Sequence, residues 1–282
     1  MSQIAPLKPP FPYYGGKTRI APAIVELLPE HKHYIEPFAG ALSVLLAKPP
    51  SVMETVNDIN GDIVNFFQVL RDNRAELEAV CFLTPHSRQE HASARVLDGA
   101  DPIERARRTF VLLSQGRNAS LRKTGWAHFQ NPAGGGSRSN YIRNMIGRFE
   151  PIAARILEVT LECRDGLTVI EEFGRFPDNL LYVDPPYLAS TRTSSGYAAE
   201  FSRLDQHRVL LDALKECKAA VVLSGYPSEL YESALAGWDR ISVEGSRNVN
   251  NTATPETIWS NRPLHGQQKF AFVSDSGEQV RG

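Results

Sequence analysis

Cysteine is scarce in this chain, with three residues in 282, and this scarcity argues against both a disulfide framework and a zinc site. Cys81, Cys163 and Cys217 lie far apart without metal-binding spacing, and the histidines are equally scattered, so we assign no metal. An odd number of cysteines without a pairing pattern is typical of reduced thiols inside a cell.

The sequence also has no long apolar run and almost no net charge. No stretch approaches the roughly 18 apolar residues of a membrane-spanning helix, and the start, MSQIAPLKPPFP, has no apolar core of a signal peptide. A net charge of −1 indicates no global preference for nucleic acid, so a surface for such a partner must be local. We therefore expect a cytoplasmic globular protein that does not bind membranes.

The apolar residues alternate between strand and helix spacing at both ends of the chain. This order predicts an α/β protein with a largely parallel sheet and helices on both faces, of the Rossmann-like kind. The expected strands are 33–36, 53–58, 155–165, 179–187, 219–227, 238–243 and 269–274. The expected helices around them are 18–29, 42–48, 61–72, 204–218 and 230–237.

The composition changes sharply between the two α/β parts. Residues 101–150 contain nine basic residues but three acids, a charge of +6 inside a chain of −1. Helical spacing at 74–83 and 101–115 leads into a polar segment rich in Gly, Asn, Ser and Arg. We therefore divide the chain into a discontinuous α/β domain, 1–71 with 155–282, and a mostly helical insertion, 72–154. The insertion is either a nucleic-acid surface or a solvated polar region.

The tetrapeptide Asp184-Pro185-Pro186-Tyr187 follows the apolar strand NLLYV. Two prolines fix φ and disfavour a helix, so the chain leaves the strand through a stiff exit. An exocyclic amine such as adenine N6 is a poor nucleophile, because its lone pair is delocalised. The Asp184 carboxylate and the Pro185 carbonyl can accept its two hydrogens while Tyr187 stacks on the base, and a stiff backbone preorganises these groups. Alone, the tetrapeptide could also be an ordinary turn.

Two upstream loops carry small residues and charges. Glu36-Pro37-Phe38-Ala39-Gly40-Ala41 follows the first core strand, where small side chains let backbone amides approach a ligand. Asp58 ends the next strand and can accept hydrogen bonds from a ribose or cap the helix that follows. Tyr13-Tyr14-Gly15-Gly16-Lys17 suits a carboxylate or phosphate, although its spacing is not that of a P-loop. Tight or flexible turns would explain the glycines of both loops as well.

Taken in order, YYGGK, EPFAGALSV, NDIN, the insertion and YVDPPYL resemble the Dam-type DNA adenine-N6 methyltransferases, a family with phage members. The order is similar to that of the α group of amino-methyltransferases, and the resemblance covers essentially the whole chain. Ala41 stands where many members have a second glycine, and Tyr13 stands where some have tryptophan.

The resemblance implies S-adenosylmethionine as cofactor and assigns residues to it. Those that would contact it are Tyr13, Lys17, Glu36, Phe38, Gly40, Asp58, Asp165 and Asp184, with Asp58 on the ribose and Asp165 on the adenine. Asp165 could equally belong to a surface turn. The catalytic residues would be Asp184, Pro185, Pro186 and Tyr187.

The resemblance also implies double-stranded DNA as the partner, with the target base flipped out of the duplex. The segment GRNASLRKTGWAHFQNP has the outline of the DNA-contacting hairpin of the family. The candidates for DNA contacts are Arg117, Asn118, Arg122, Lys123, Trp126 and Arg247. Arg247 and Glu256 match a closing motif near the target site. We expect a monomer or a weak dimer on DNA.

Two alternatives stay open at this point. The tetrapeptide serves any exocyclic amine, so cytosine N4 or RNA could be the substrate. A silent DNA-binding module on the same fold would need neither the tetrapeptide nor the cofactor loops. Phage self-protection, restriction–modification and host gene regulation all use the same chemistry, so the sequence assigns no target site and no biological role.

Overall fold

The computed structural model describes residues 6–97, 99–122, 124–128, 137–187, 204–243 and 255–264. A seven-stranded sheet forms its centre, with the strand order β3-β2-β1-β4-β5-β7-β6. The strands are β1 (His33–Glu36), β2 (Met53–Asn57), β3 (Thr160–Glu162), β4 (Asn179–Val183), β5 (Ala220–Gly225), β6 (Asp239–Val243) and β7 (Glu256–Ser260). β1 to β5 pair in parallel, whereas β7 runs antiparallel to β5 and β6. The Rossmann-like α/β fold predicted from the sequence is confirmed.

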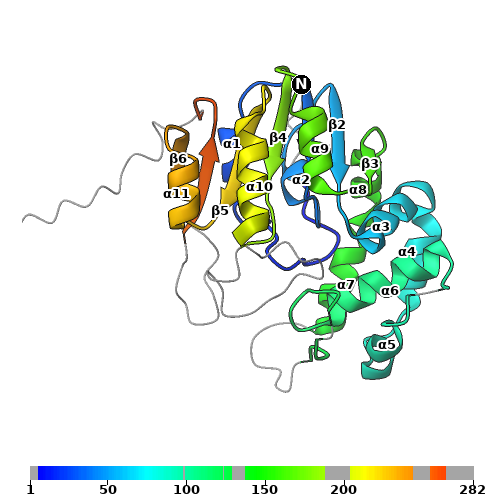
Figure 1. Ribbon diagram of the computed structural model, residues 1–282. Coiled ribbons are helices and arrows are strands. Elements are labelled where there is room, and N and C mark those ends of the chain that lie inside the picture. The colour runs from blue at the N-terminus through cyan, green and yellow to red at the C-terminus, as the bar shows by residue number, and fades with distance from the viewer. Residues whose placement is uncertain are drawn as a thin grey trace, which may run out of the picture.

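Helices cover both faces of the sheet, as the periodicity predicts. Figure 1 shows α9 (Gly166–Phe173), α10 (Leu204–Lys215) and α11 (Glu229–Ala234) in front of the sheet, with α1 (Ala21–Leu27) and α2 (Ser43–Ala47) behind it. Neighbouring residues of a strand point to opposite faces. On β4, Leu181 and Val183 therefore pack in the cluster of α9, α10 and α11, while Leu180 and Tyr182 pack in the cluster of α1, α2 and α3 (Gly61–Asp72).

The insertion consists of five helices in the described residues: α4 (Arg74–Leu83), α5 (Arg88–Ser93), α6 (Pro102–Gln115), α7 (Arg138–Ile146) and α8 (Phe149–Arg155). α3 joins them to the sheet by packing against α4, α6 and α8. Phe66 of α3 contacts Phe110 of α6 and Phe149 of α8. One apolar cluster therefore continues from the sheet into the insertion.

Three expected elements differ in the structure. The strand expected over 155–165 is shorter, because α8 and a turn continue the helical course of the chain before β3 begins at Thr160. Residues 256–260, for which the sequence analysis predicted no strand, form β7, and all five are buried. The strand expected at 269–274 lies outside the described residues. None of the helices in the described residues is long and apolar enough to cross a membrane.

Two neighbouring strands direct the chain to opposite faces of the sheet. β1 continues into α2 on one face, and β4 leads toward α10 on the other. The carboxyl ends of β1 and β4 lie side by side, because the strands pair in parallel from His33 with Asn179 onward. In open α/β sheets the crevice at such a switch point is where ligands bind.

Candidate active site

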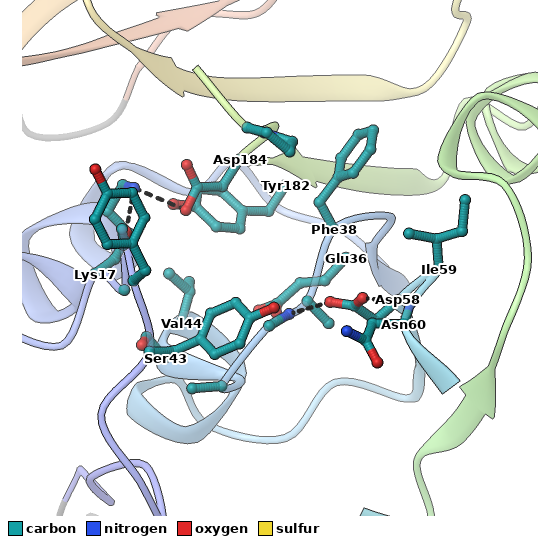
Figure 2. A pocket seen from close by; sticks show the side chains of 18 of the residues that line it. Lys17, Glu36, Phe38, Ser43, Val44, Asp58, Ile59, Asn60, Tyr182 and Asp184 are labelled. Atoms are coloured by element: carbon teal, nitrogen blue, oxygen red, sulfur yellow. Dashed lines mark hydrogen bonds and ion pairs between the residues drawn. The ribbon is translucent and has the colours of Figure 1, made fainter. Parts of the chain in front are cut away.

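A cavity of about 360 Å³ lies at this switch point. Its walls come from the loop before α1, the loops after β1 and β2, and the exit of β4. Seven of the residues predicted to contact the cofactor line it: Tyr13, Lys17, Glu36, Phe38, Gly40, Asp58 and Asp184. Figure 2 shows Lys17 and Asp184 at one end of the cavity and Asp58 with Asn60 at the other. A volume of a few hundred Å³ is typical of small-molecule sites.

The loop after β1 turns sharply at Gly40, whose φ of +50° is a left-handed conformation. A Cβ atom at this position would lie 2.9 Å from the ring of Tyr13. The amide of Gly40 donates to Asp58 Oδ2 at 2.9 Å, and the amide of Asn60 donates to Asp58 Oδ1 at 2.8 Å. Asp58 therefore joins the loops after β1 and β2. Burial raises the pKa of the Asp58 carboxyl, although the hydrogen bonds from the two backbone amides lower it.

Asn57, just before Asp58, connects the carboxyl ends of three strands. Its side-chain amide donates to the carbonyls of Pro37 (2.9 Å) and Arg164 (3.0 Å), and its Oδ1 accepts from the Arg164 amide at 2.8 Å. The side chain is buried. No sequence motif predicted this role for Asn57, because its partners lie on segments distant in the chain.

Glu36, the last residue of β1, is a buried acid in the cavity wall. Its Oε1 accepts from the Tyr34 hydroxyl at 2.6 Å and from the Leu45 amide at 2.8 Å. Burial, aided by the negative charge of Asp184, raises the pKa of Glu36 to about 7 against the lowering effect of the two hydrogen bonds and of the Lys48 charge. The carboxyl group is therefore close to half-protonated near neutral pH.

Asp184 lies at the end of β4 among three groups from other segments. Lys17 Nζ lies 2.8 Å from Asp184 Oδ2, and Ser224 of β5 donates to Oδ1 at 3.1 Å. The hydroxyl oxygen of Tyr187 lies 3.2 Å from Oδ1 as well. Lys17 Nζ lies 3.4 Å from Glu256 Oε1 as well, so one ammonium contacts two carboxylates. These contacts fix the direction of the carboxylate at the cavity wall.

Tyr187 is buried, with its hydroxyl bonded to both Asp184 and Glu256. Lys17 Nζ lies 4.8 Å from the centre of its ring, and Tyr226 packs edge-on against it at 4.8 Å. Burial raises the pKa of Glu256, and the charge of Lys17 lowers it. Glu256 matched the closing motif of the family in the sequence, and the structure brings it to the tetrapeptide.

Asp165 has a different place from the other predicted cofactor residues. Its side chain is exposed, and its Oδ1 accepts from the Leu167 amide at 2.7 Å as the N-cap of α9. It does not line the cavity. Asp165 thus serves as a surface helix cap between β3 and α9.

The insertion carries the expected hairpin. Arg117 donates its amide to Gly125 at 2.9 Å, and Ala127 donates to Gln115 at 2.8 Å. The ring of Trp126 stacks on the rings of His86 and His128, with centres 4.6 and 4.9 Å away. Trp126 is therefore held at the base of the hairpin.

Several basic residues of the insertion form ion pairs within the protein. Arg107 pairs with Glu104 and Glu90, each at 2.6 Å, and Arg108 pairs with Glu104 at 2.6 Å. Arg105 reaches Asp62 of α3. Part of the positive charge that we predicted to contact DNA is thus neutralised by acidic side chains of the protein itself.

Arg117 and Asn118 are exposed on the hairpin, and Arg122 is half-buried. The carbonyl of Ala119 accepts from the Tyr14 amide at 2.9 Å, which attaches this loop to the cavity wall. Lys123 and Arg247, both predicted to contact DNA, lie outside the described residues.

Fold and cavity define a Rossmann-like α/β protein whose candidate ligand site lies at the switch point of its sheet. Residues 13–249 match the family model of the D12 class N6 adenine-specific DNA methyltransferase, and the chain belongs to that family. The DNA adenine-N6 methyltransferase class predicted from the sequence is thereby confirmed.

Curated relatives agree with this family. A DNA N-6-adenine-methyltransferase of Escherichia phage P1 is 25% identical over 246 residues, which cover 79% of this chain and 31% of the phage protein. The chain thus spans about a third of that relative. A DNA adenine methylase of Vibrio cholerae is 25% identical over 249 residues, covering 84% of this chain and 87% of that protein.

Among solved structures, the chain is similar to a SAM-dependent methyltransferase from Agrobacterium tumefaciens. The TM-score is 0.35 and the identity 10%, over 85% of this chain and 58% of that chain. A likeness this low adds nothing about the function.

Proposed function

We propose that the chain transfers the methyl group of S-adenosylmethionine to N6 of an adenine in double-stranded DNA. The observation that carries this proposal is that Asp184, the acid of the tetrapeptide, lines the same cavity as Gly40 and Asp58. The acceptor for the target amine and the loops that suit a nucleoside cofactor therefore meet at one edge of the sheet.

The residues of the cavity fit this cofactor. The carboxyl groups of Glu36, Asp58 and Asp184 line it together with one ammonium, that of Lys17, so the described lining favours a ligand with positive charge. S-adenosylmethionine carries a sulfonium and an ammonium. Each carboxylate oxygen of Asp58 accepts one amide hydrogen and has a second acceptor position, which suits the ribose hydroxyls.

We assign the cofactor contacts from the resemblance to the family. Tyr13, Lys17, Glu36, Phe38 and Gly40 would surround the methionine part. Asp165 remains a prediction for the adenine end, while its Oδ1 accepts from the Leu167 amide as a helix cap.

When bound, the cofactor would supply a methyl group activated by its sulfonium sulfur, which would keep the electron pair of the carbon–sulfur bond. Asp184 and the carbonyl of Pro185 accept the two hydrogens of the target amine and direct its lone pair toward the cavity. The nitrogen then releases one proton, for which Asp184 is the adjacent base. Pro185 and Pro186 hold both acceptors, because their φ angles are fixed.

DNA binding would use the hairpin of the insertion. Arg117 and Asn118 are exposed there, and Arg122 follows in the same loop. Lys123 and Arg247 remain predictions for this surface. Trp126 would support the hairpin from its base, where it stacks on two histidines. The target adenine would leave the duplex to reach Asp184, at a cost of a few kcal/mol.

These assignments give the two parts of the chain different roles. Residues 1–71 and 155–282 would perform the transfer, and residues 72–154 would recognise the target. We expect the chain to work as a monomer or a weak dimer on DNA, in the cytoplasm of a bacterium or a phage-infected cell.

The test is to incubate the protein with methyl-labelled S-adenosylmethionine and double-stranded DNA, and to digest the product to nucleosides. N6-methyladenine is the expected product. N4-methylcytosine, or transfer to RNA alone, would contradict the assigned substrate. If no nucleic acid accepts label and the cofactor does not crosslink to the protein, the chain is a silent binding module. Sequencing DNA from expressing cells with detection of modified adenines then gives the target sequence.

A further inference from the structure

We propose that Ser224 is a positioning residue for Asp184 and that the hydroxyl of Tyr182 acts through it. Three side chains from two neighbouring strands form a chain of hydrogen bonds, Tyr182 to Ser224 to Asp184. The inference rests on the proposed function, because it assigns a task to the orientation of Asp184.

The sheet register brings Ser224 to Asp184. β4 and β5 pair in parallel with Val183 opposite Leu223, so the next residue of each strand lies at the same level. Ser224 is the polar residue in the strand AVVLSG, and its side chain is fully buried. A buried hydroxyl is costly unless it is hydrogen-bonded. Ser224 has two such hydrogen bonds, one with Tyr182 of β4 and one with Asp184 at the exit of β4.

The direction of the hydrogen bonds follows from the acceptor. An ionised carboxylate can only accept, so the single hydrogen of Ser224 points to Asp184 Oδ1 at 3.1 Å. The bond between Ser224 and Tyr182, also 3.1 Å, must then be donated by the tyrosine hydroxyl. The chain is therefore polarised toward the carboxylate, which strengthens each bond in it.

The same contacts determine which oxygen of Asp184 serves the amine. Oδ1 accepts from Ser224, and the Tyr187 hydroxyl, which also contacts Glu256, lies 3.2 Å from the same oxygen, so protein groups face both of its acceptor positions. Oδ2 contacts Lys17 and keeps one position. We therefore assign the amine hydrogen to Oδ2, and Ser224 helps to fix the rotation of the carboxylate that presents this oxygen.

The first test compares the single-turnover methylation rate at saturating cofactor and DNA with the affinity for S-adenosylhomocysteine measured by calorimetry. We expect Ser224→Ala to lower the rate about 10- to 100-fold, as a misplaced catalytic group does, while the affinity changes less than about threefold. The matched control is Ser260→Ala. Ser260 is a fully buried serine of β7 that accepts from the Arg262 amide at 3.1 Å, and we expect the wild-type rate.

The second test is a double-mutant cycle. Tyr182→Phe should lower the rate less than Ser224→Ala does, and it should cause no further loss in the Ser224→Ala background, because Tyr182 acts through Ser224. Multiplying losses would contradict the relay. A wild-type rate in Ser224→Ala, or an equal loss in Ser260→Ala, would contradict the positioning role.

Crystal structures of the wild type and Ser224→Ala give a readout that does not depend on activity. We expect the Asp184 carboxylate to rotate away from its wild-type orientation in the variant, and an unchanged orientation would overturn the inference. If the wild type methylates no nucleic acid, the proposed function fails, whereas the two structures still decide whether Ser224 orients Asp184.

Discussion

Buried Lys17 and half-buried Asp184 form an ion pair, with 2.8 Å between Nζ and Oδ2. Lys17 comes from the loop before α1 and Asp184 from the exit of β4, so the pair joins two walls of the cavity. Glu256 lies 3.4 Å from the same ammonium. One cation therefore stabilises two carboxylates that would otherwise repel each other in a buried site.

Lys17→Met should destabilise the protein by about 3 kcal/mol at pH 8, because it leaves two buried carboxylates without their cation. Burial already raises the pKa of Glu256, and without Lys17 it rises further. The folded variant then binds more protons than its unfolded state. The decrease in its free energy of unfolding relative to the wild type should therefore grow with pH and be smaller at pH 5. Urea unfolding at both pH values measures this. Lys32→Met, which removes an exposed partner of Asp178, should change little. Equal losses at both pH values would contradict the expectation.

Asp184→Ala should abolish methyl transfer while cofactor binding persists at least in part, because Gly40 and Asp58 lie on other walls of the cavity. Filter-binding assays with labelled cofactor and transfer assays with DNA separate the two effects. Asp178→Ala is the control, since Asp178 lies before β4 on the protein surface and pairs with Lys32. Full transfer activity in Asp184→Ala would refute the proposed mechanism.

Glu36→Gln should remove a pH-dependent contribution to stability. Burial raises the pKa of Glu36 to about 7 in the folded protein, whereas an unfolded glutamate titrates near 4.5. The folded state therefore holds the proton longer, and stability falls as the pH rises from about 4.5 to about 7. The variant should lack this fall, so its advantage over the wild type should grow toward pH 8, to about 3 kcal/mol at most. Denaturant midpoints between pH 4 and pH 8 test it, and parallel profiles would contradict it.

Gly40→Ala should weaken the binding of S-adenosylhomocysteine. The new Cβ would meet the Tyr13 ring at 2.9 Å, in a backbone conformation with φ of +50° that costs an L-residue about 1 kcal/mol. Gly237→Ala is the matched control, because Gly237 has φ of +92° but no described heavy atom within 4 Å of the added Cβ. It should lose stability and retain ligand affinity. Titration calorimetry measures the ligand affinity of each variant, and scanning calorimetry measures its stability. Equal affinities in the two variants would exclude the predicted role of the Tyr13 contact.

Arg117→Ala should weaken DNA binding. The negative slope of log K against log salt should become about one unit shallower, as expected for a residue that contacts one phosphate. Arg107→Ala offers the contrast, because Arg107 is paired with Glu104 and Glu90 inside the insertion. It should lower stability and leave the slope unchanged. Fluorescence anisotropy across a salt series measures both slopes. A change for Arg107 and none for Arg117 would reverse our assignment of the DNA surface.

The amino-acid sequence determined the class of fold and part of the cavity lining. Apolar periodicity predicted the sheet and its helices, and the resemblance to the family implied that Glu36, Asp58 and Asp184 would contact one cofactor. The shortness of β3 and the existence of β7 were not predicted. A five-residue strand such as Glu256–Ser260 is defined by its partners β5 and β6 as much as by its own residues.

Tertiary structure alone decided the partners of each polar group. Ser224 reaches Asp184 because β5 pairs with β4 in one register, and Asp165 faces solvent because it caps α9. The charge of the insertion is visible in the sequence, but the pairing of Arg107 with Glu90 depends on how α5 packs on α6. A hydrogen bond or ion pair is set by distances of about 3 Å between atoms. Residue types determine which groups can pair, and packing determines which of them do.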